Sequence, residues 1–285
     1  MRGAVSESPG QGEGVLECGS RPLRPHCGSS DGEVTRGMFP KSSRSTIADL
    51  SHNVHRFSGM TFGREHEMAL PVGNWLRRHG MQVKPEFAVP WGICDFVAVS
   101  LNATKVRKRL EFGQINAIGP LWRVSLLQHI PDKETGRSIT QSKLERLCGA
   151  PPEFTGKELE KLIADRFVRR TARLSLQKLN GWFPLHNRIV AVELKLSRVS
   201  DALAQASCNR AFATESFIAI PTETALRILS GPRRADFVNA GVGILGVTQT
   251  RCKVMLKPSA RGIQADPTLQ MHCVERFWRT KDSST

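Results

Sequence analysis

The chain centres on the segment Arg188-Ile189-Val190-Ala191-Val192-Glu193-Leu194-Lys195-Leu196. Its apolar side chains alternate with a period of two, which predicts a buried β-strand. One face carries Val190, Val192, Leu194 and Leu196, and the other carries Ile189, Ala191, Glu193 and Lys195. Two charges on a core strand need an explanation, because desolvating an unpaired charge costs several kcal/mol. Either the strand ends in an exposed ion pair, or the charges belong to a metal-dependent phosphodiesterase site.

The composition favours a polyanionic partner. The 285 residues carry a net charge of +15 at pH 7, and 40% of them are hydrophobic, which is enough for a packed core. Such a charge favours nucleic acid over a membrane surface, although it can also serve solubility alone. Seven scattered cysteines without a Cys-x-x-Cys motif favour reduced thiols and a cytoplasmic location. We expect no membrane association, because no apolar run approaches the roughly 20 residues of a membrane span.

Shifts in composition divide the chain into two tails, a core and an insertion. Residues 1–58 are rich in Gly, Ser, Pro and Arg and lack apolar periodicity, which predicts a disordered tail or an untranslated start of the reading frame. This tail has 7 basic and 6 acidic residues, so the basic excess lies further along the chain. Residues 258–285 are predicted to be a basic tail with little pattern. The core is predicted in two pieces, 59–104 and 187–257, around an insertion over 105–186.

The two core pieces predict an α/β fold with a mixed β-sheet flanked by helices. The expected helices cover 63–79, 200–213 and 223–229, and the expected strands cover 82–89, 93–100, 188–196, 216–221, 242–247 and, weakly, 252–256. Pro71 falls inside the first helix and predicts a kink there. Ser200 is the predicted N-cap of the second helix. A strand–helix–strand unit with buried strands implies a parallel crossover, so the sheet is predicted to be mixed.

The insertion is predicted to be mainly helical and basic. Helices are expected over 118–129, 140–148 and 155–169, followed by a strand over 173–179. Thr140 is the predicted N-cap of the second helix, and Thr155 with Glu158 has capping-box spacing at the start of the third. Three helices followed by a basic strand and a glycine turn resemble a winged helix-turn-helix.

The charge of the insertion supports a role in nucleic-acid binding. It holds 16 basic and 8 acidic residues, a difference of +8, which is about half of the net charge of the chain. The alternative is a helical insertion that merely covers a face of the sheet. The predicted nucleic-acid-binding residues, along the third helix and the wing, are Arg166, Arg169, Arg170, Arg173 and Lys178.

Further carboxylates lie on core elements near the Glu-x-Lys triplet. Asp95 lies on the expected strand 93–100, and Glu65 lies on the inward face of the first helix, whereas Glu67 lies off that face. Converging carboxylates repel each other, and a divalent cation removes this penalty. Mg²⁺, or Mn²⁺, takes oxygen ligands and keeps water that it can activate, while a nearby lysine can orient that water. The predicted metal ligands are Asp95, Glu193 and Glu65.

This order of residues resembles the PD-(D/E)XK nuclease superfamily, which has the restriction-endonuclease-like fold, over residues 62–100 and 187–250. Asp95 matches the metal-binding aspartate of the family, and Glu193 and Lys195 match its Glu-x-Lys. Glu65, or else Glu67, matches the acid that many members carry on the first helix. Gln205 looks like the glutamine of the following helix in several branches. The resemblance implies the catalytic set Glu193, Lys195, Asp95, Glu65 and Gln205.

Three departures from the family pattern affect the prediction. The acid of the first helix is ambiguous between Glu65 and Glu67, and Pro71 unsettles that helix. Cys94 stands before Asp95 where many members have proline, and 98 residues separate Asp95 from Glu193 where a short hairpin turn is usual. The insertion must therefore leave and re-enter the sheet at a strand connection, a position that tolerates insertions. The expected function is a metal-dependent endonuclease acting on double-stranded or branched DNA, as a monomer or a homodimer. The alternative is a DNA-binding or regulatory protein that keeps the fold without catalysis.

Overall fold

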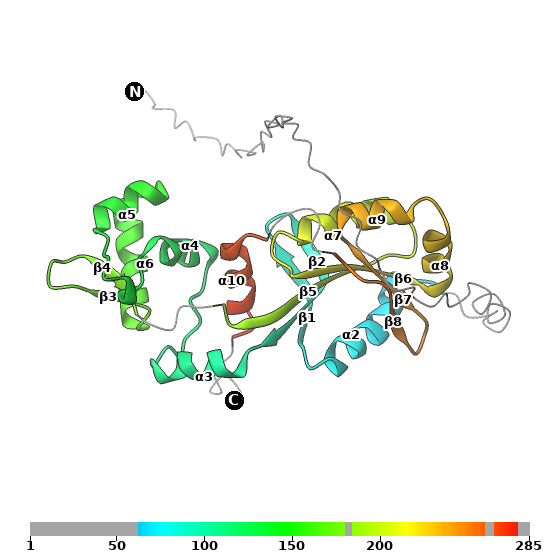
Figure 1. The fold of residues 1–285 in the computed structure, drawn as a ribbon, viewed down its shortest axis with the longest axis horizontal. Helices are drawn as coiled ribbons and strands as arrows, with labels where there is room; N and C mark the ends of the chain where they lie inside the picture. Colours follow the sequence, from blue (N-terminus) through cyan, green and yellow to red (C-terminus); the bar gives the residue numbers. More distant parts are fainter. Residues whose placement is uncertain (1–61, 180–183, 260–264, 279–285) are drawn as a thin grey trace, which may run out of the picture. The chain divides into compact units, whose positions relative to one another are not determined.

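The computed structural model describes residues 62–179, 184–259 and 265–278 (Figure 1). The predicted disordered tail, residues 1–58, lies outside the described residues. The described part of the chain contains a six-stranded mixed sheet with helices on its faces, which confirms the α/β class. Within these ranges no helix is long and apolar enough to cross a membrane.

The sheet is mixed, as the predicted crossovers require. Its strands are β1 (Gln82–Val89), β2 (Gly92–Leu101), β5 (His186–Leu194), β6 (Glu215–Pro221), β7 (Gly243–Val247) and β8 (Cys252–Leu256). They lie in the order β1-β2-β5-β6-β7-β8. The pairs β5–β6 and β6–β7 are parallel, and the other neighbours are antiparallel.

The strands β2 and β5 are hydrogen-bonded neighbours despite their separation in sequence. Phe96 pairs with Val192, and Val97 pairs with Ala191. The chain between them leaves the sheet after β2 and returns to it at β5. Because the two strands pair, Asp95 and Glu193 can lie close together although a long segment separates them in the sequence.

The alternation along β5 buries both of its faces. Val190 and Val192 pack against the helix α2 (Ala69–Arg78), which follows the 3₁₀ turn η2 (Glu65–Met68). Ile189 and Ala191 belong to the apolar cluster on the opposite face. That face is covered by the helices α7 (Val199–Asn209), α8 (Thr222–Ser230), α9 (Arg234–Ala240) and α10 (Pro267–Glu275).

Two predicted details of the core helices need correction. Pro71 lies in the first turn of α2, where its missing N–H is not needed, so it does not kink a helix interior. The helix α7 begins at Val199, and its N-cap residue is Arg198 in the left-handed region at φ 46°, rather than Ser200.

The inserted segment has its own apolar core. Its elements are α3 (Ala103–Glu111), α4 (Leu121–His129), η3 (Lys133–Thr135), α5 (Gln141–Cys148), α6 (Pro152–Ala164), β3 (Val168–Arg170) and β4 (Leu176–Lys178). The last two strands form an antiparallel pair. Leu126, Leu144, Leu159 and Phe167 are fully or almost fully buried in this core, which Met271 of α10 completes.

The capping of the inserted helices was predicted correctly at one end and wrongly at another. The Thr140 hydroxyl accepts a hydrogen bond from Lys143 N at 3.3 Å, which confirms this N-cap. The next helix begins at Pro152 instead of Thr155, because the pair Pro151–Pro152 already fits a helix start. Glu158 pairs with Arg123 instead of closing a capping box. That helix ends at Ala164, before the predicted position 169.

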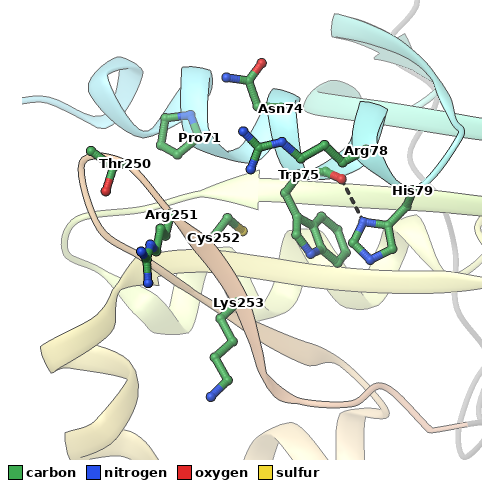
Figure 2. Close-up of a pocket in the computed structure, with 9 residues that line it drawn as sticks. All are labelled: Pro71, Asn74, Trp75, Arg78, His79, Thr250, Arg251, Cys252 and Lys253. Carbon is green, nitrogen blue, oxygen red and sulfur yellow. Dashed lines mark hydrogen bonds between the residues drawn. The ribbon is translucent and has the colours of Figure 1, made fainter. Parts of the chain in front are cut away.

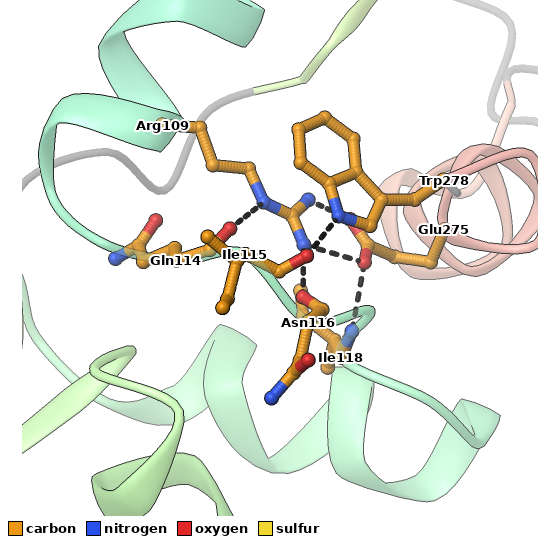
Figure 3. A network of polar contacts seen from close by, with 7 residues as sticks. All are labelled: Arg109, Gln114, Ile115, Asn116, Ile118, Glu275 and Trp278. Atoms are coloured by element: carbon orange, nitrogen blue, oxygen red, sulfur yellow. Dashed lines mark hydrogen bonds and ion pairs between the residues drawn. The ribbon is translucent and has the colours of Figure 1, made fainter. Parts of the chain in front are cut away.

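The prediction of an unpatterned tail is wrong over Pro267–Glu275, which forms α10. Asp266 caps this helix by accepting a hydrogen bond from Thr268 N at 2.6 Å. At its other end the buried Glu275 carboxylate pairs with the buried Arg109 guanidinium of α3 (Figure 3). Cys273 and Val274 pack in the cluster below the sheet, so α10 joins the sheet to the inserted segment.

Candidate functional site

Asp95 and Glu193 face each other where β2 and β5 pair. The Leu194 N–H donates a hydrogen bond to Asp95 Oδ2 at 2.7 Å. The Glu193 residue is only 3% exposed, and Asn209 Nδ2 donates to its Oε1 at 2.6 Å. Each carboxyl lies close enough to the other to change its protonation. The structure therefore brings together two acids that are 98 residues apart in the sequence.

Burial raises the pKa of both carboxyls. The pKa of Glu193 rises to about 7, since desolvation and the charge of Asp95 outweigh the hydrogen bond from Asn209. Desolvation also raises the pKa of Asp95, against the opposing effects of the Leu194 N–H and the Lys195 charge. Two interacting acids titrate as a pair, so near neutral pH this pair holds part of a proton.

Lys195 and Glu65 lie beside Asp95 and Glu193, and these four residues form one cluster. Lys195 Nζ lies 3.2 Å from Glu65 Oε2, and the Leu196 N–H donates to Glu65 Oε1 at 3.3 Å. Both charges also act on Asp95. Glu67 instead accepts a hydrogen bond from Gly63 N at 2.9 Å. Of the two acids that the sequence offers on the first helix, Glu65 is the one at the site.

The buried amide of Asn209 was missed in the sequence. Its Nδ2 binds Glu193 and also lies 3.4 Å from Cys94 Sγ, while Trp91 Nε1 donates to its Oδ1 at 3.1 Å. The helical spacing contained a usable signal, because Asn209 continues the face formed by the buried Ala202 and Ala206. A polar residue on a buried helix face needs a partner.

Gln205 is not at the acids in this structure. It lies one turn before Asn209 on α7, is exposed, and makes no hydrogen bond to the acid cluster among the described contacts. The family resemblance had suggested this glutamine for the site. The amide that contacts the site comes from Asn209 instead.

The basic side chains predicted to bind nucleic acid divide into two groups. Arg166, Arg169, Arg170 and Arg173 are exposed at the end of α6 and on the β3–β4 hairpin. Lys178 is only 5% exposed and pairs with Asp132 at 3.5 Å. Burial lowers the pKa of Lys178. The four arginines are therefore available to a ligand, whereas Lys178 is part of the interior.

The acids suit a divalent cation, although the described residues do not already surround one position with three ligands. Among the described residues, no group of three His, Cys, Asp or Glu side chains is arranged to hold a metal. Asp95 and Glu193 nevertheless supply carboxylate oxygens that repel each other, and this repulsion is what a cation relieves. An oxygen-only donor set with few protein ligands suits Mg²⁺ or Mn²⁺, because Mg²⁺ keeps several waters.

Comparison with known proteins does not assign a family. No family model matches the chain, and no curated protein matches it. A similar solved structure is the SPO1766 protein of unknown function from Silicibacter pomeroyi, with 12% sequence identity and a TM-score of 0.34. The match covers 78% of this chain and 94% of that chain. A similarity this weak carries no argument about fold or function.

Proposed function

We propose that the protein is a metal-dependent nuclease of the PD-(D/E)XK type that hydrolyses phosphodiester bonds in DNA. The observation that supports this proposal is the meeting of Asp95, Glu193 and Lys195 at one junction of β2 and β5, with Glu65 beside them. These residue types in this order are the ones that the resemblance implies. A buried acid with a raised pKa also marks a candidate functional site.

Each residue of the cluster has a distinct proposed task. Asp95 and Glu193 would hold Mg²⁺ or Mn²⁺, with Glu65 as a further candidate ligand. When bound, the cation would neutralise the acids and lower the pKa of a coordinated water. Lys195 is partly exposed and presents an ammonium that can orient the attacking water or offset charge on the phosphate. Asn209 fixes the orientation of the Glu193 carboxylate.

The inserted segment is proposed to grip DNA as a winged-helix-like module. The order of the helices α4, α5 and α6 followed by the β3–β4 hairpin supports this assignment. The exposed Arg173 lies in the hairpin turn, and Arg169 lies on β3. The exposed pair of Arg170 with Glu160 is a weak one, so this arginine can exchange its partner for a phosphate.

The test is cleavage of plasmid and branched DNA in Mg²⁺, in Mn²⁺ and in EDTA. We expect Glu193→Ala and Lys195→Ala to lower the cleavage rate by on the order of 10²–10³-fold. Glu223→Ala is a matched control, because it removes an exposed acid of α8 that forms no ion pair among the described residues. Equal cleavage by all four proteins would remove the assigned site. Salt-sensitive binding without cleavage under any metal would instead support the non-catalytic DNA-binding alternative.

A further inference from the structure

A second candidate site lies between α2 and the β7–β8 hairpin (Figure 2). This pocket has a volume of about 360 Å³. The helix contributes Trp75, Arg78 and His79, and the hairpin contributes Arg251, Cys252 and Lys253. None of the acids of the first site lines it.

The charge of the pocket favours an anion. Arg78, Arg251 and Lys253 are exposed, and none of them forms an ion pair with another described residue. No carboxylate is among the described residues that line the pocket. Three unneutralised cations around one hollow create a local positive potential that attracts phosphate groups.

An aromatic side chain inside the pocket favours a flat ligand. The Trp75 ring is half-buried, and its centroid lies 4.6 Å from that of His79 and 6.0 Å from that of Phe217. His79 is held in turn by a 2.7 Å hydrogen bond between its Nδ1 and the Trp75 carbonyl. The ring is therefore supported before any ligand arrives. Aromatic rings of this kind stack on nucleic-acid bases.

The pocket and the acids lie toward the same edge of the sheet, although α2 covers one face of the sheet and the Glu193 side chain contacts α7 on the other. The parallel strands β5, β6 and β7 end at the same edge of the sheet, and the hairpin with Arg251 follows β7. Glu193 lies near the end of β5 at this edge. On the other side of the pocket, α2 directly follows η2, which carries Glu65. A strand bound at the acids would therefore have to cross this edge of the sheet to reach the pocket.

We propose that this pocket binds an unpaired nucleotide, with its base against Trp75 and its phosphate against Arg78, Arg251 and Lys253. The volume is within the range of small-ligand sites. A base that is paired within a duplex is stacked and cannot enter such a pocket, so the inference specifies DNA with a single-stranded segment as the ligand. It rests on the proposed nuclease function in taking this strand to be the substrate. Burial raises the pKa of Cys252 to about 12, so this thiol contributes contact rather than a nucleophile.

The test is binding of a fluorescein-labelled single-stranded oligonucleotide to the full chain in EDTA, measured by anisotropy against a duplex of the same sequence. We expect tighter binding of the single strand. Trp75→Leu should weaken it about tenfold, since stacking of one base is worth roughly this much. Arg251→Ala with Lys253→Ala should lower the slope of log K against log salt by about 1.4, or ~0.7 for each phosphate contact.

Two controls keep the result interpretable. Arg227→Ala with Arg234→Ala removes the same charge from α8 and α9, on the opposite face of the sheet, and should leave binding within about twofold. Trp75→Phe keeps an aromatic ring and should retain most of the affinity, which separates stacking from misfolding. Unchanged single-strand affinity in Trp75→Leu and in the Arg251/Lys253 double variant would overturn the inference.

The outcomes separate this inference from the nuclease proposal. If single-strand binding depends on the pocket residues but no metal supports cleavage, the nuclease proposal is refuted and the proposed nucleotide pocket is retained. If cleavage needs Glu193 but none of the pocket variants changes single-strand binding, the proposed nucleotide pocket is refuted and the nuclease proposal is retained.

Discussion

The Asn209 amide donates a 2.6 Å hydrogen bond to Glu193, and both residues are buried. Trp91 holds the same amide from its other side through a 3.1 Å bond to Oδ1. The orientation of one acid of the site is thus fixed by a chain of contacts that starts in the turn between β1 and β2. Such supporting contacts position reactive groups to within a fraction of an ångström.

Removing the Asn209 amide should impair the site while leaving its acids and lysine in place. Asn209→Ala deletes a hydrogen bond that lowers the pKa of Glu193, so this pKa should rise above about 7. We expect cleavage at pH 7 to fall about tenfold, and the acid limb of the pH–rate profile to move to higher pH. Gln205→Ala is the matched control, because Gln205 is an exposed amide on the same helix. An unmoved profile in Asn209→Ala, or an equal loss in Gln205→Ala, would contradict this assignment.

Loss of the Glu193 proton should destabilise the folded protein as the pH rises. Its pKa is 4.5 in the unfolded chain and about 7 in the folded protein, so the folded state binds more protons between these values. The free energy of unfolding should therefore fall by about 3 kcal/mol, at ~1.4 kcal/mol per pKa unit. This fall begins near pH 4.5 and is complete just above pH 7. Glu193→Gln should reduce this slope to the contribution of Asp95, whose pKa is also raised, and should stabilise the metal-free protein at pH 8. Denaturant unfolding in EDTA at pH 5 and pH 8 measures it, and an unchanged slope in the variant would refute it.

Glu65 and Glu67 can be separated by two variants that each remove one charge. Glu65→Gln releases Lys195 from its ion pair and should lower cleavage at least tenfold if Glu65 serves the site. Its effect on stability should stay within about 1 kcal/mol, since both side chains are partly exposed. Glu67→Gln weakens only the contact with Gly63 N and should keep full activity. If Glu67→Gln lowers the cleavage rate more than Glu65→Gln does, then Glu67 is the acid that serves the site.

The buried pair of Arg109 and Glu275 should be important for stability. The guanidinium also donates to the carbonyls of Gln114 and Asn116, and its carbon lies 4.0 Å from the centroid of the Trp278 ring (Figure 3). Glu275→Gln leaves a buried cation without its counter-charge, which costs about 3–5 kcal/mol. Glu160→Gln breaks an exposed pair and should cost less than about 1 kcal/mol. Thermal or urea unfolding compares them, and similar losses would contradict the buried role.

Periodicity in the sequence was sufficient to predict most strands of the sheet and to place Asp95 and Glu193 on two of them. Alternation identified β5 and β2, and carboxylates on apolar strands marked Asp95 and Glu193. These signals are local, because a buried strand shows its own period and a charge on it stands out. The pairing of β2 with β5 was expected from the family resemblance, in which the two strands are neighbours and the long segment is an insertion between them.

The errors arose where a tertiary contact decides the structure. Glu275 looks like an ordinary charge in a basic tail, and only its contact with Arg109 explains why it is buried. Lys178 lies in a basic segment that resembles a DNA-binding wing, yet its side chain is buried and pairs with Asp132. Thr155 fits a capping box, but two prolines start the helix earlier. Local rules do not report which of two plausible partners the folded chain provides.

The bond between Arg109 and Glu275 also has a consequence for synthesis. The two residues are 166 positions apart, so a ribosome adding about 5–20 residues per second makes the second roughly 8–33 s after the first. During that interval the nascent helical insertion already carries its arginine, while the carboxylate that neutralises it has not been made. The insertion is translated before β5 to β8, yet it reaches its final packing only after them.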